Sequence, residues 1–152
     1  MTRLRLPDRQ RSLWIDGICI NQEASGERSH QVKLMKAVYS NTEQALVWLG
    51  DGGQTSAVAV AIFEALAQQD APPGELADLE RIFASVTDLP QAIQAVEELL
   101  QCSWARRLWV VQEVELASSA IFLYGSYMFS RDTLEWAILC LIEANTSFGV
   151  GL

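Results

Sequence analysis

The sequence has little histidine, little cysteine and no long apolar run. One histidine and three cysteines, Cys19, Cys102 and Cys140, with no C-x-x-C pair, argue against a metal site and against a disulfide framework. Unpaired thiols are typical of a reducing compartment. No apolar stretch approaches the roughly 18 residues of a membrane span, and no signal peptide opens the chain. We therefore expect a cytoplasmic protein with no membrane span and no bound metal.

Basic residues are also scarce, with eleven Lys and Arg against nineteen Asp and Glu and a formal charge of −8. Because nucleic-acid affinity comes largely from clustered Lys and Arg, no nucleic-acid partner is expected. Half of the 152 residues are apolar, which is enough for one core in one domain. We predict an exposed basic arm over residues 1–11, an α/β domain over 12–145 and a tail over 146–152.

Two apolar runs predict buried parallel strands, the first over residues 12–18 and the second over 44–50. Between them, Ser25 is a candidate cap for a helix whose predicted buried face holds Val32, Met35, Val38 and Tyr39. Strand, helix and strand form a βαβ unit with a right-handed crossover. Polar groups that follow the first strand would then lie at the carboxyl edge of the sheet, where ligands bind in open α/β folds.

The pattern of the remaining residues predicts a helical insertion followed by a third strand of the sheet. Gly50 to Gly53 is predicted to be a plain turn, because it lacks the spacing of a phosphate-binding loop. Helices are predicted near residues 55–69, 76–86, 90–100, 104–117 and from Asp132 onward, with a third strand at 120–125 closed by Gly125.

Two separated motifs carry a family resemblance. The first is Leu-Trp-Ile-Asp-Gly-Ile-Cys-Ile-Asn-Gln over residues 13–22, followed by Glu27-Arg28. The second is Trp104-x-x-Arg107-x-Trp109-Val-Val-Gln112-Glu113-Val-x-Leu-Ala over residues 104–117. Together with Val-Trp-Leu-Gly at 47–50, these motifs resemble the fungal heterokaryon incompatibility (HET) domain. The motif residues expected to matter structurally are Trp14, Glu27, Arg28, Arg107 and Gln112.

The resemblance implies a cytosolic signalling module of filamentous fungi, which triggers programmed cell death when genetically different hyphae fuse. It also implies partners, through self-association or contact with other signalling domains. The family's first motif, a strand of the type Tyr-x-x-Leu-Ser-Tyr-x-Trp-Gly, is absent from residues 1–11, so we expect the domain to be truncated at its start. The family is in turn distantly similar to TIR domains, which implies a three-layer, flavodoxin-like and mostly parallel sheet flanked by helices.

The same comparison raises an enzymatic alternative, because some TIR domains cleave NAD. Trp109 and Glu113 are four residues apart and share a helix face, so the carboxylate could stabilise an oxocarbenium-like state as nicotinamide leaves. Asp16, Asn21 and Gln22 could complete the ligand site at the strand end. NAD would then be a substrate, and no cofactor is expected.

Each of these residues also has a structural interpretation. Glu113 can pair with Arg28 or Arg107, and Asp16 can cap a loop or bond Arg28. Asn21 and Gln22 can hold their loop through bonds between side chains and the backbone. Three functions therefore stay open: a signalling module as the leading one, an NAD glycohydrolase with Glu113 as the catalytic carboxylate, and an inactive truncated paralogue.

Overall fold

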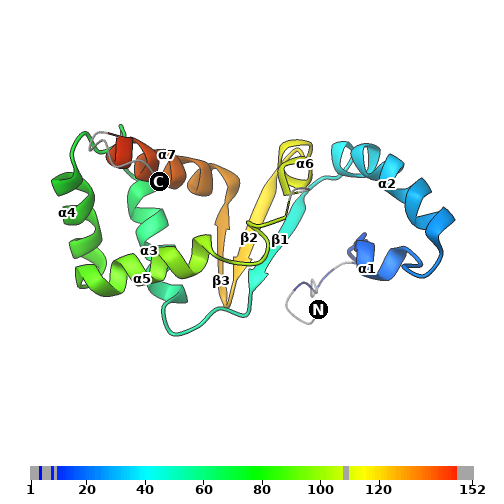
Figure 1. Cartoon of the computed structure of the whole chain (residues 1–152), viewed down its shortest axis with the longest axis horizontal. Coiled ribbons are helices and arrows are strands. Elements are labelled where there is room, and N and C mark those ends of the chain that lie inside the picture. The colour runs from blue at the N-terminus through cyan, green and yellow to red at the C-terminus, as the bar shows by residue number, and fades with distance from the viewer. Residues whose placement is uncertain (1–3, 5–7, 9, 108–109, 147–152) are drawn as a thin grey trace. The chain divides into compact units, whose positions relative to one another are not determined.

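The computed structural model describes residues 4, 8, 10–107 and 110–146, and the chain divides into two compact units, Met1–Val38 and Tyr39–Leu152. Figure 1 shows the helices and strands in chain order. Their bounds are α1 (Asp16–Cys19), α2 (Ser25–Ser40), β1 (Ala45–Gly50), α3 (Ser56–Ala67), α4 (Leu76–Val86), α5 (Leu89–Leu100), α6 (Val110–Glu115), β2 (Ala120–Tyr124), β3 (Tyr127–Ser130) and α7 (Arg131–Thr146).

The predicted first strand is wrong. Residues 12–15 are irregular, and Asp16–Cys19 forms one helical turn, in which the amides of Ile18 and Cys19 donate to the Ile15 carbonyl at 2.9 and 2.7 Å. No described strand pairs with this segment, so its backbone satisfies itself locally. Residues 12–18 are rich in residues that favour strands, but this composition does not decide the conformation of the segment, because strand preference depends on a neighbouring strand.

The helix predicted after residue 25 is confirmed as α2, but its predicted buried face is only partly right. Met35, Val38 and Tyr39 are half-buried, whereas Val32 is exposed, and no residue of α2 is fully buried. Among the described residues of the first unit, Ile20 is the only buried apolar side chain. The first unit therefore has almost no core of its own.

The second unit contains a three-stranded sheet in the order β1-β2-β3. β1 and β2 confirm the strands predicted at 44–50 and 120–125, and they pair in parallel, with Val47 opposite Phe122. The parallel partner of β1 is thus β2 and not the segment at 12–18. β3 was not predicted, and it pairs antiparallel with β2, so that Phe129 lies opposite Phe122.

Gly125 makes the turn between β2 and β3 possible. Tyr124 pairs with Tyr127, which leaves Gly125 and Ser126 as a two-residue connection. Gly125 has a φ of 56°, and no other residue type has a positive φ among the described residues. This combination matches a type II′ turn, whose first central position takes glycine and whose twist suits a hairpin.

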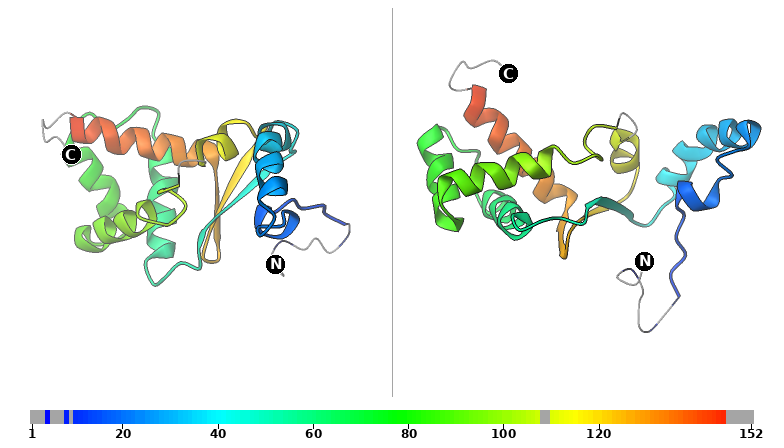
Figure 2. Two further views of the ribbon diagram at one scale, coloured as in Figure 1. Left: turned by 45° about the vertical axis from the view of Figure 1, so that its right-hand side comes forward. Right: turned by 60° about the horizontal axis from the view of Figure 1, so that its bottom comes forward.

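One face of the sheet carries the core. Val47, Leu49, Phe122 and Phe129 are buried on this face, and Phe63 of α3 contacts Phe129. Helices α3 and α7 lie side by side against the sheet in both figures (Figures 1 and 2). The opposite face is open at Trp48, which is 49% exposed, so the strand that was predicted to be buried is buried on one face.

The helical insertion follows the sequence pattern closely. α3, α4 and α5 confirm the three predicted helices, and Asp88 caps α5 by accepting a hydrogen bond from the Gln91 amide at 3.1 Å. The helix predicted over 104–117 is shorter than expected, because residues 101–106 form turns and α6 spans only Val110–Glu115. Leu108 and Trp109 lie outside the described residues.

The last helix is present as α7, and its apolar side is buried in part. Leu134 and Leu141 pack against the core beside the fully buried and small Ala137 and Cys140, whereas Ile142 is 52% exposed. Small side chains let α7 approach its neighbours closely, since the distance between helix axes depends on the side chains at the contact. The helix begins at Arg131, one residue before the predicted start at Asp132, and the Ser130 hydroxyl before it accepts a hydrogen bond from the Thr133 backbone amide at 3.1 Å.

The α/β class is confirmed, with helices packed on a mixed sheet. Of the two strand pairs, one is parallel and one is antiparallel.

We expect Phe122→Ala to lower the free energy of unfolding by about 3–5 kcal/mol, because it empties a fully buried site at the centre of the sheet. Urea unfolding followed by tryptophan fluorescence measures this. Met128→Ala is the matched control on the same hairpin, and because Met128 is largely exposed its effect stays within about 0.5 kcal/mol. Equal losses in the two variants would contradict the assigned core face.

Candidate functional site

The polar residues of the first motif bind one another and their own loop. The backbone amide of Asn21 donates to Glu27 Oε1 at 3.0 Å, and the side-chain oxygen Oδ1 of Asn21 accepts from the backbone amide of Glu23 at 3.1 Å. Gln22 Nε2 donates to the Asp16 carbonyl at 3.0 Å. Through these contacts the side chains of Asn21 and Gln22 bond the backbone of the segment between α1 and α2.

Asp16 does not lie at the end of a strand. It opens α1 as an exposed residue, and its Oδ1 accepts from the Gly17 amide at 2.7 Å. A carboxylate in the first turn also interacts favourably with the helix dipole. Arg28 is exposed on α2, and Trp14 is half-buried in the segment before α1. The expected buried strand carrying an acid is therefore replaced by a helical turn that begins with this exposed acid.

Glu113 of the second motif forms an ion pair with Arg107 at 3.8 Å between Oε2 and Nη2. The Glu113 side chain is 16% exposed and that of Arg107 is 54% exposed. This is one of the structural partners expected for Glu113. Trp109 and the side chain of Gln112 lie outside what the structure describes. Asp16, Asn21 and Gln22 belong to the first unit and Glu113 to the second, so the structure describes the two sets of residues separately.

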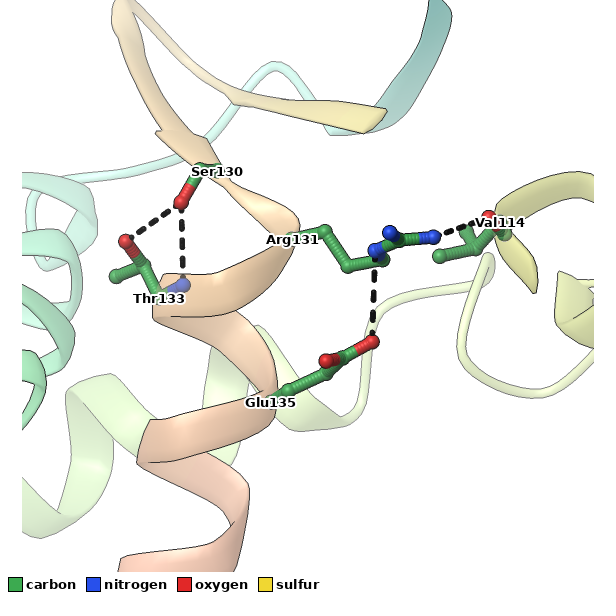
Figure 3. A network of polar contacts seen from close by, with 5 residues as sticks. All are labelled: Val114, Ser130, Arg131, Thr133 and Glu135. Atoms are coloured by element: carbon green, nitrogen blue, oxygen red, sulfur yellow. Dashed lines mark hydrogen bonds and ion pairs between the residues drawn. The ribbon is translucent and has the colours of Figure 1, made fainter. Parts of the chain in front are cut away.

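Arg131 anchors the second motif to the helix that follows the hairpin. Its Nη1 donates to the Val114 carbonyl at 3.1 Å, and its Nε lies 3.6 Å from Glu135 Oε1 (Figure 3). Val114 is buried, so its carbonyl needs this donor. Ser130 and Thr133 close the start of α7 beside it, with 3.0 Å between their hydroxyl oxygens (Figure 3). α6 is thereby tied to α7 across 17 residues of sequence.

A second polar cluster lies where β1 and β2 end, and the sequence interpretation missed it. Ser56 Oγ accepts from the Gly53 amide at 2.6 Å and donates to the Gly53 carbonyl at 2.9 Å. Thr55, also buried, donates to Glu98 of α5. Gly52 has a φ of 72°, and a Cβ on it would meet Ser56 Oγ and lie 3.0 Å from Gly125 Cα. The sequence signal that could have indicated this cluster is the group of glycines at 50–53 followed by Thr55 and Ser56.

These contacts shift two pKa values. Hydrogen bonds from Thr55 and then Gln94 lower the pKa of Glu98, against a smaller effect of burial. Burial raises the pKa of the Tyr124 phenol, a hydrogen bond with Ser56 opposes it, and the charges of Glu98 and Cys102 add to the rise. Because its polar groups bond one another, the cluster closes the loop after β1 against α3 and α5.

Other kinds of site are not found in the described part of the chain. Residues 4, 8, 10–107 and 110–146 contain no group of three or more potential metal ligands. No described helix is long and apolar enough to cross a membrane. Two buried indole nitrogens, on Trp104 and Trp136, have no hydrogen-bond partner among the described residues.

Comparison with known proteins decides the family. The family model described as "Heterokaryon incompatibility protein (HET)" matches residues 1–113, about three quarters of the chain and both motifs up to Glu113. The chain belongs to the HET family. A curated relative from Neurospora crassa, heterokaryon incompatibility protein 6, OR allele, is 28% identical over 145 residues, which cover 78% of this chain and 21% of that protein.

The HET chain thus spans about a fifth of the length of this relative. No solved structure matches it. The match to the family rests on side-chain identity along the sequence, so it holds although the segment at 12–18 is not a strand. In the HET motifs, the described polar residues contact near neighbours in sequence or, in the case of α6, Arg131.

We expect Arg131→Ala in the HET chain to lower the free energy of unfolding by about 1–3 kcal/mol, because the buried Val114 carbonyl loses its charged donor. Arg81→Ala is the control, since it removes an exposed ion pair with Asp78 and changes stability by about 0.5 kcal/mol or less. Urea unfolding compares the two variants. Similar small effects would show that Arg131 does not hold α6.

We expect Tyr124→Phe to reduce the loss of stability in alkali. The raised pKa means that the folded state favours the neutral phenol, so this contribution is complete below about pH 10 and is lost as pH rises through the folded pKa. Urea unfolding between about pH 8 and about pH 12 measures the loss. Tyr127→Phe, at an exposed tyrosine, should behave like the wild type. An unchanged alkaline profile in Tyr124→Phe would contradict this.

Proposed function

We propose that this chain acts in heterokaryon incompatibility, as a cytoplasmic signalling module of fungal non-self recognition that leads to programmed cell death. The support is the family membership, both motifs in their expected order, and the name of the Neurospora crassa relative. The module works by self-association or by contact with other signalling domains, and it needs neither nucleic acid nor a cofactor.

The single observation that supports a signalling module over an enzyme is the ion pair of Glu113. A catalytic carboxylate must face its substrate, whereas Glu113 lies 3.8 Å from Arg107 and is mostly buried. Asn21 and Gln22 are likewise engaged with their own loop. Motif residues used in this way stabilise the shape of a surface, which is what an assembly module requires. NAD cleavage by Glu113 is the alternative that the experiment below tests.

We also propose that the sheet is part of a three-layer arrangement similar to TIR and flavodoxin-like domains. The support is the parallel pair β1 and β2, joined by a helical crossover that packs on one sheet face. Its second face is apolar and partly open at Trp48. Sheets with parallel strands are usually covered on both faces, so a further layer would fit there.

We expect expression of this chain in a filamentous fungus to arrest growth without loss of cellular NAD, and Glu113→Gln to leave that arrest in place. Loss of the partly exposed ion pair costs about 1 kcal/mol or less, which is too little to unfold the chain. Hyphal growth, a vital dye and an NAD assay are the measurements. The Neurospora crassa relative is the comparator.

Glu115→Gln is the matched control, since Glu115 is an exposed acid on the same helix. NAD consumption that disappears in Glu113→Gln and persists in Glu115→Gln would establish the enzyme and overturn the proposal. A wild-type chain that neither arrests growth nor consumes NAD, while the relative does arrest growth, would identify an inactive paralogue.

A further inference from the structure

One edge of the sheet has no partner strand among the described residues. In the order β1-β2-β3, the two edge strands are β1 and β3. β3 has only four residues and continues directly into α7, so it is a short edge. β1 (Ala45–Gly50) is longer, and it contains no charged residue and no proline. Folded proteins usually protect an edge strand with charges, with proline or by keeping it very short, so β1 is the less protected edge of this sheet.

The open backbone groups of β1 belong to Leu46 and Trp48. The Ala45 amide donates to the Ser119 carbonyl at 2.8 Å, so the backbone of Ala45 faces β2. The backbone groups of successive residues in a strand face opposite edges, which turns the amides and carbonyls of Leu46 and Trp48 away from β2. Beyond Trp48 the register shifts, and the Gly50 carbonyl is bonded on the β2 side. The open edge therefore offers two donors and two acceptors.

The side chains of the same two residues lie on the face of the sheet opposite the core. Val47 and Leu49 are buried on the core face, whereas Leu46 is half-buried and Trp48 is 49% exposed. A tryptophan side chain gains much from burial, because its ring is large and mostly apolar. A strand that pairs with this edge would thus meet open hydrogen-bonding groups and apolar side chains at the same two residues.

We propose that β1 of one copy of this chain pairs antiparallel with β1 of a second copy, around a two-fold axis at Val47. Leu46 of each copy then lies opposite Trp48 of the other, and each such pair exchanges two N–H···O bonds. Every donor and acceptor that the edge offers is used in this register. The contact is isologous, so it closes as a dimer in which the two sheets become one continuous sheet.

The side chains favour the same register. Leu46 of one copy and Trp48 of the other are directly opposite and on the same face, where a cross-strand pair of an aromatic and an aliphatic residue is stabilising. This inference rests on the proposed function, since it names the surface through which the signalling module self-associates.

A second copy is the partner that suits the chemistry of this edge. Only an extended strand can bond the open amides and carbonyls, and the described residues of the first unit form helices α1 and α2 but no strand. A charged peptide would find no opposite charge on β1, whereas an uncharged apolar strand leaves no charge unpaired. β1 is such a strand, and its donors and acceptors match their own copies. All the groups in the contact belong to residues 45–50 of the second unit.

Hydrogen exchange of the whole chain, followed by NMR, tests the pairing directly. We expect the Leu46 and Trp48 amides to exchange at least about tenfold more slowly at high than at low protein concentration, because only the dimer covers them. The Met128 amide is the internal control. Tyr124 and Tyr127 close a two-residue hairpin as a bonded pair, so the next residue, Met128, turns its amide outward at the β3 edge. Its exchange should not depend on concentration.

Proline at the edge separates backbone pairing from other contacts. Trp48→Pro removes an outward amide, and proline is tolerated at an edge where its nitrogen faces away from the sheet. Sedimentation over a range of concentrations measures dimerisation, and we expect Trp48→Pro to weaken it about tenfold or more, since each copy loses one donor. Met128→Pro is the matched control at the β3 edge and should dimerise like the wild type.

Trp48→Lys is a second variant that keeps the amide and places a charge at an exposed side chain of the edge. We expect it also to weaken dimerisation, because lysine on an edge strand opposes pairing. Circular dichroism and thermal unfolding show whether each variant folds. If the proline form does not fold, Trp48→Lys and the exchange of the wild-type amides decide the question.

Salt dependence distinguishes this contact from one made by ion pairs. Residues 39–152 contain four Lys and Arg and fifteen Asp and Glu, a net charge of −11, and β1 itself carries no charge. Two copies of the second unit therefore repel one another at long range, and no ion pair joins them at β1. We expect dimerisation to strengthen between about 0.05 M and about 0.5 M salt, because the repulsion is screened. Association that weakens as salt rises would overturn the proposal.

Other results would also overturn it. These are a wild-type chain that stays monomeric at every concentration, a dimer that neither Trp48 variant weakens, and Leu46 and Trp48 amides that are already protected in the monomer. The last result would show that the chain's own residues cover the edge.

Growth arrest is scored separately from dimerisation. Arrest by a chain that stays monomeric would remove this contact and leave the proposed function in place. Dimerisation through β1 without growth arrest, under conditions where the Neurospora crassa relative arrests growth, would remove the proposed function and leave the contact.

Discussion

The packing of one sheet face against α3 and α7 is the constraint on which the second unit depends. An aromatic row runs through it, with ring centroids 5.9 Å apart for Phe63 and Phe129, 5.5 Å for Phe129 and Phe122, and 5.2 Å for Phe122 and Trp104. Two of these contacts are edge-to-face and one is stacked, which are the arrangements that aromatic pairs prefer. This row links α3, the hairpin and the first residue of the second HET motif.

Several polar groups around this core form hydrogen bonds with one another, and these bonds fix the conformation of the loops. The loop after β1 closes because Gly52, Gly125 and the Ser56 hydroxyl approach more closely than a Cβ would permit. The loop before α6 ends at a carbonyl held by Arg131. In the first unit, Asn21 and Glu27 do the same for the start of α2. The HET motifs therefore shape the backbone locally.

The sequence predicted the elements better than it predicted their neighbours. α2, α3, α4, α5, β1 and β2 follow from periodicity and turn residues, which act within a few positions of the chain. The segment at 12–18 was mistaken for a strand, because an apolar run with Ile and Trp suits a sheet only where another strand can pair with it. β3 was missed, since four residues are too short for a clear alternation. For the site, the loop role of Asn21 and the pairing of Glu113 with Arg107 were foreseen as alternatives, whereas the cluster of Thr55, Ser56 and Glu98 was not.

What the sequence determined by itself is the family, the α/β class and the division into acidic and basic segments, since these depend on residue identity and local spacing. Only the tertiary structure decided which side of each helix is buried. α7 illustrates the reason: Leu134 and Leu141 pack against the core beside Ala137 and Cys140, whereas Ile142, which is also strongly apolar, is 52% exposed. Close packing of α7 against its neighbours depends on the shape of all the partners at once, and no single segment of the chain contains that information.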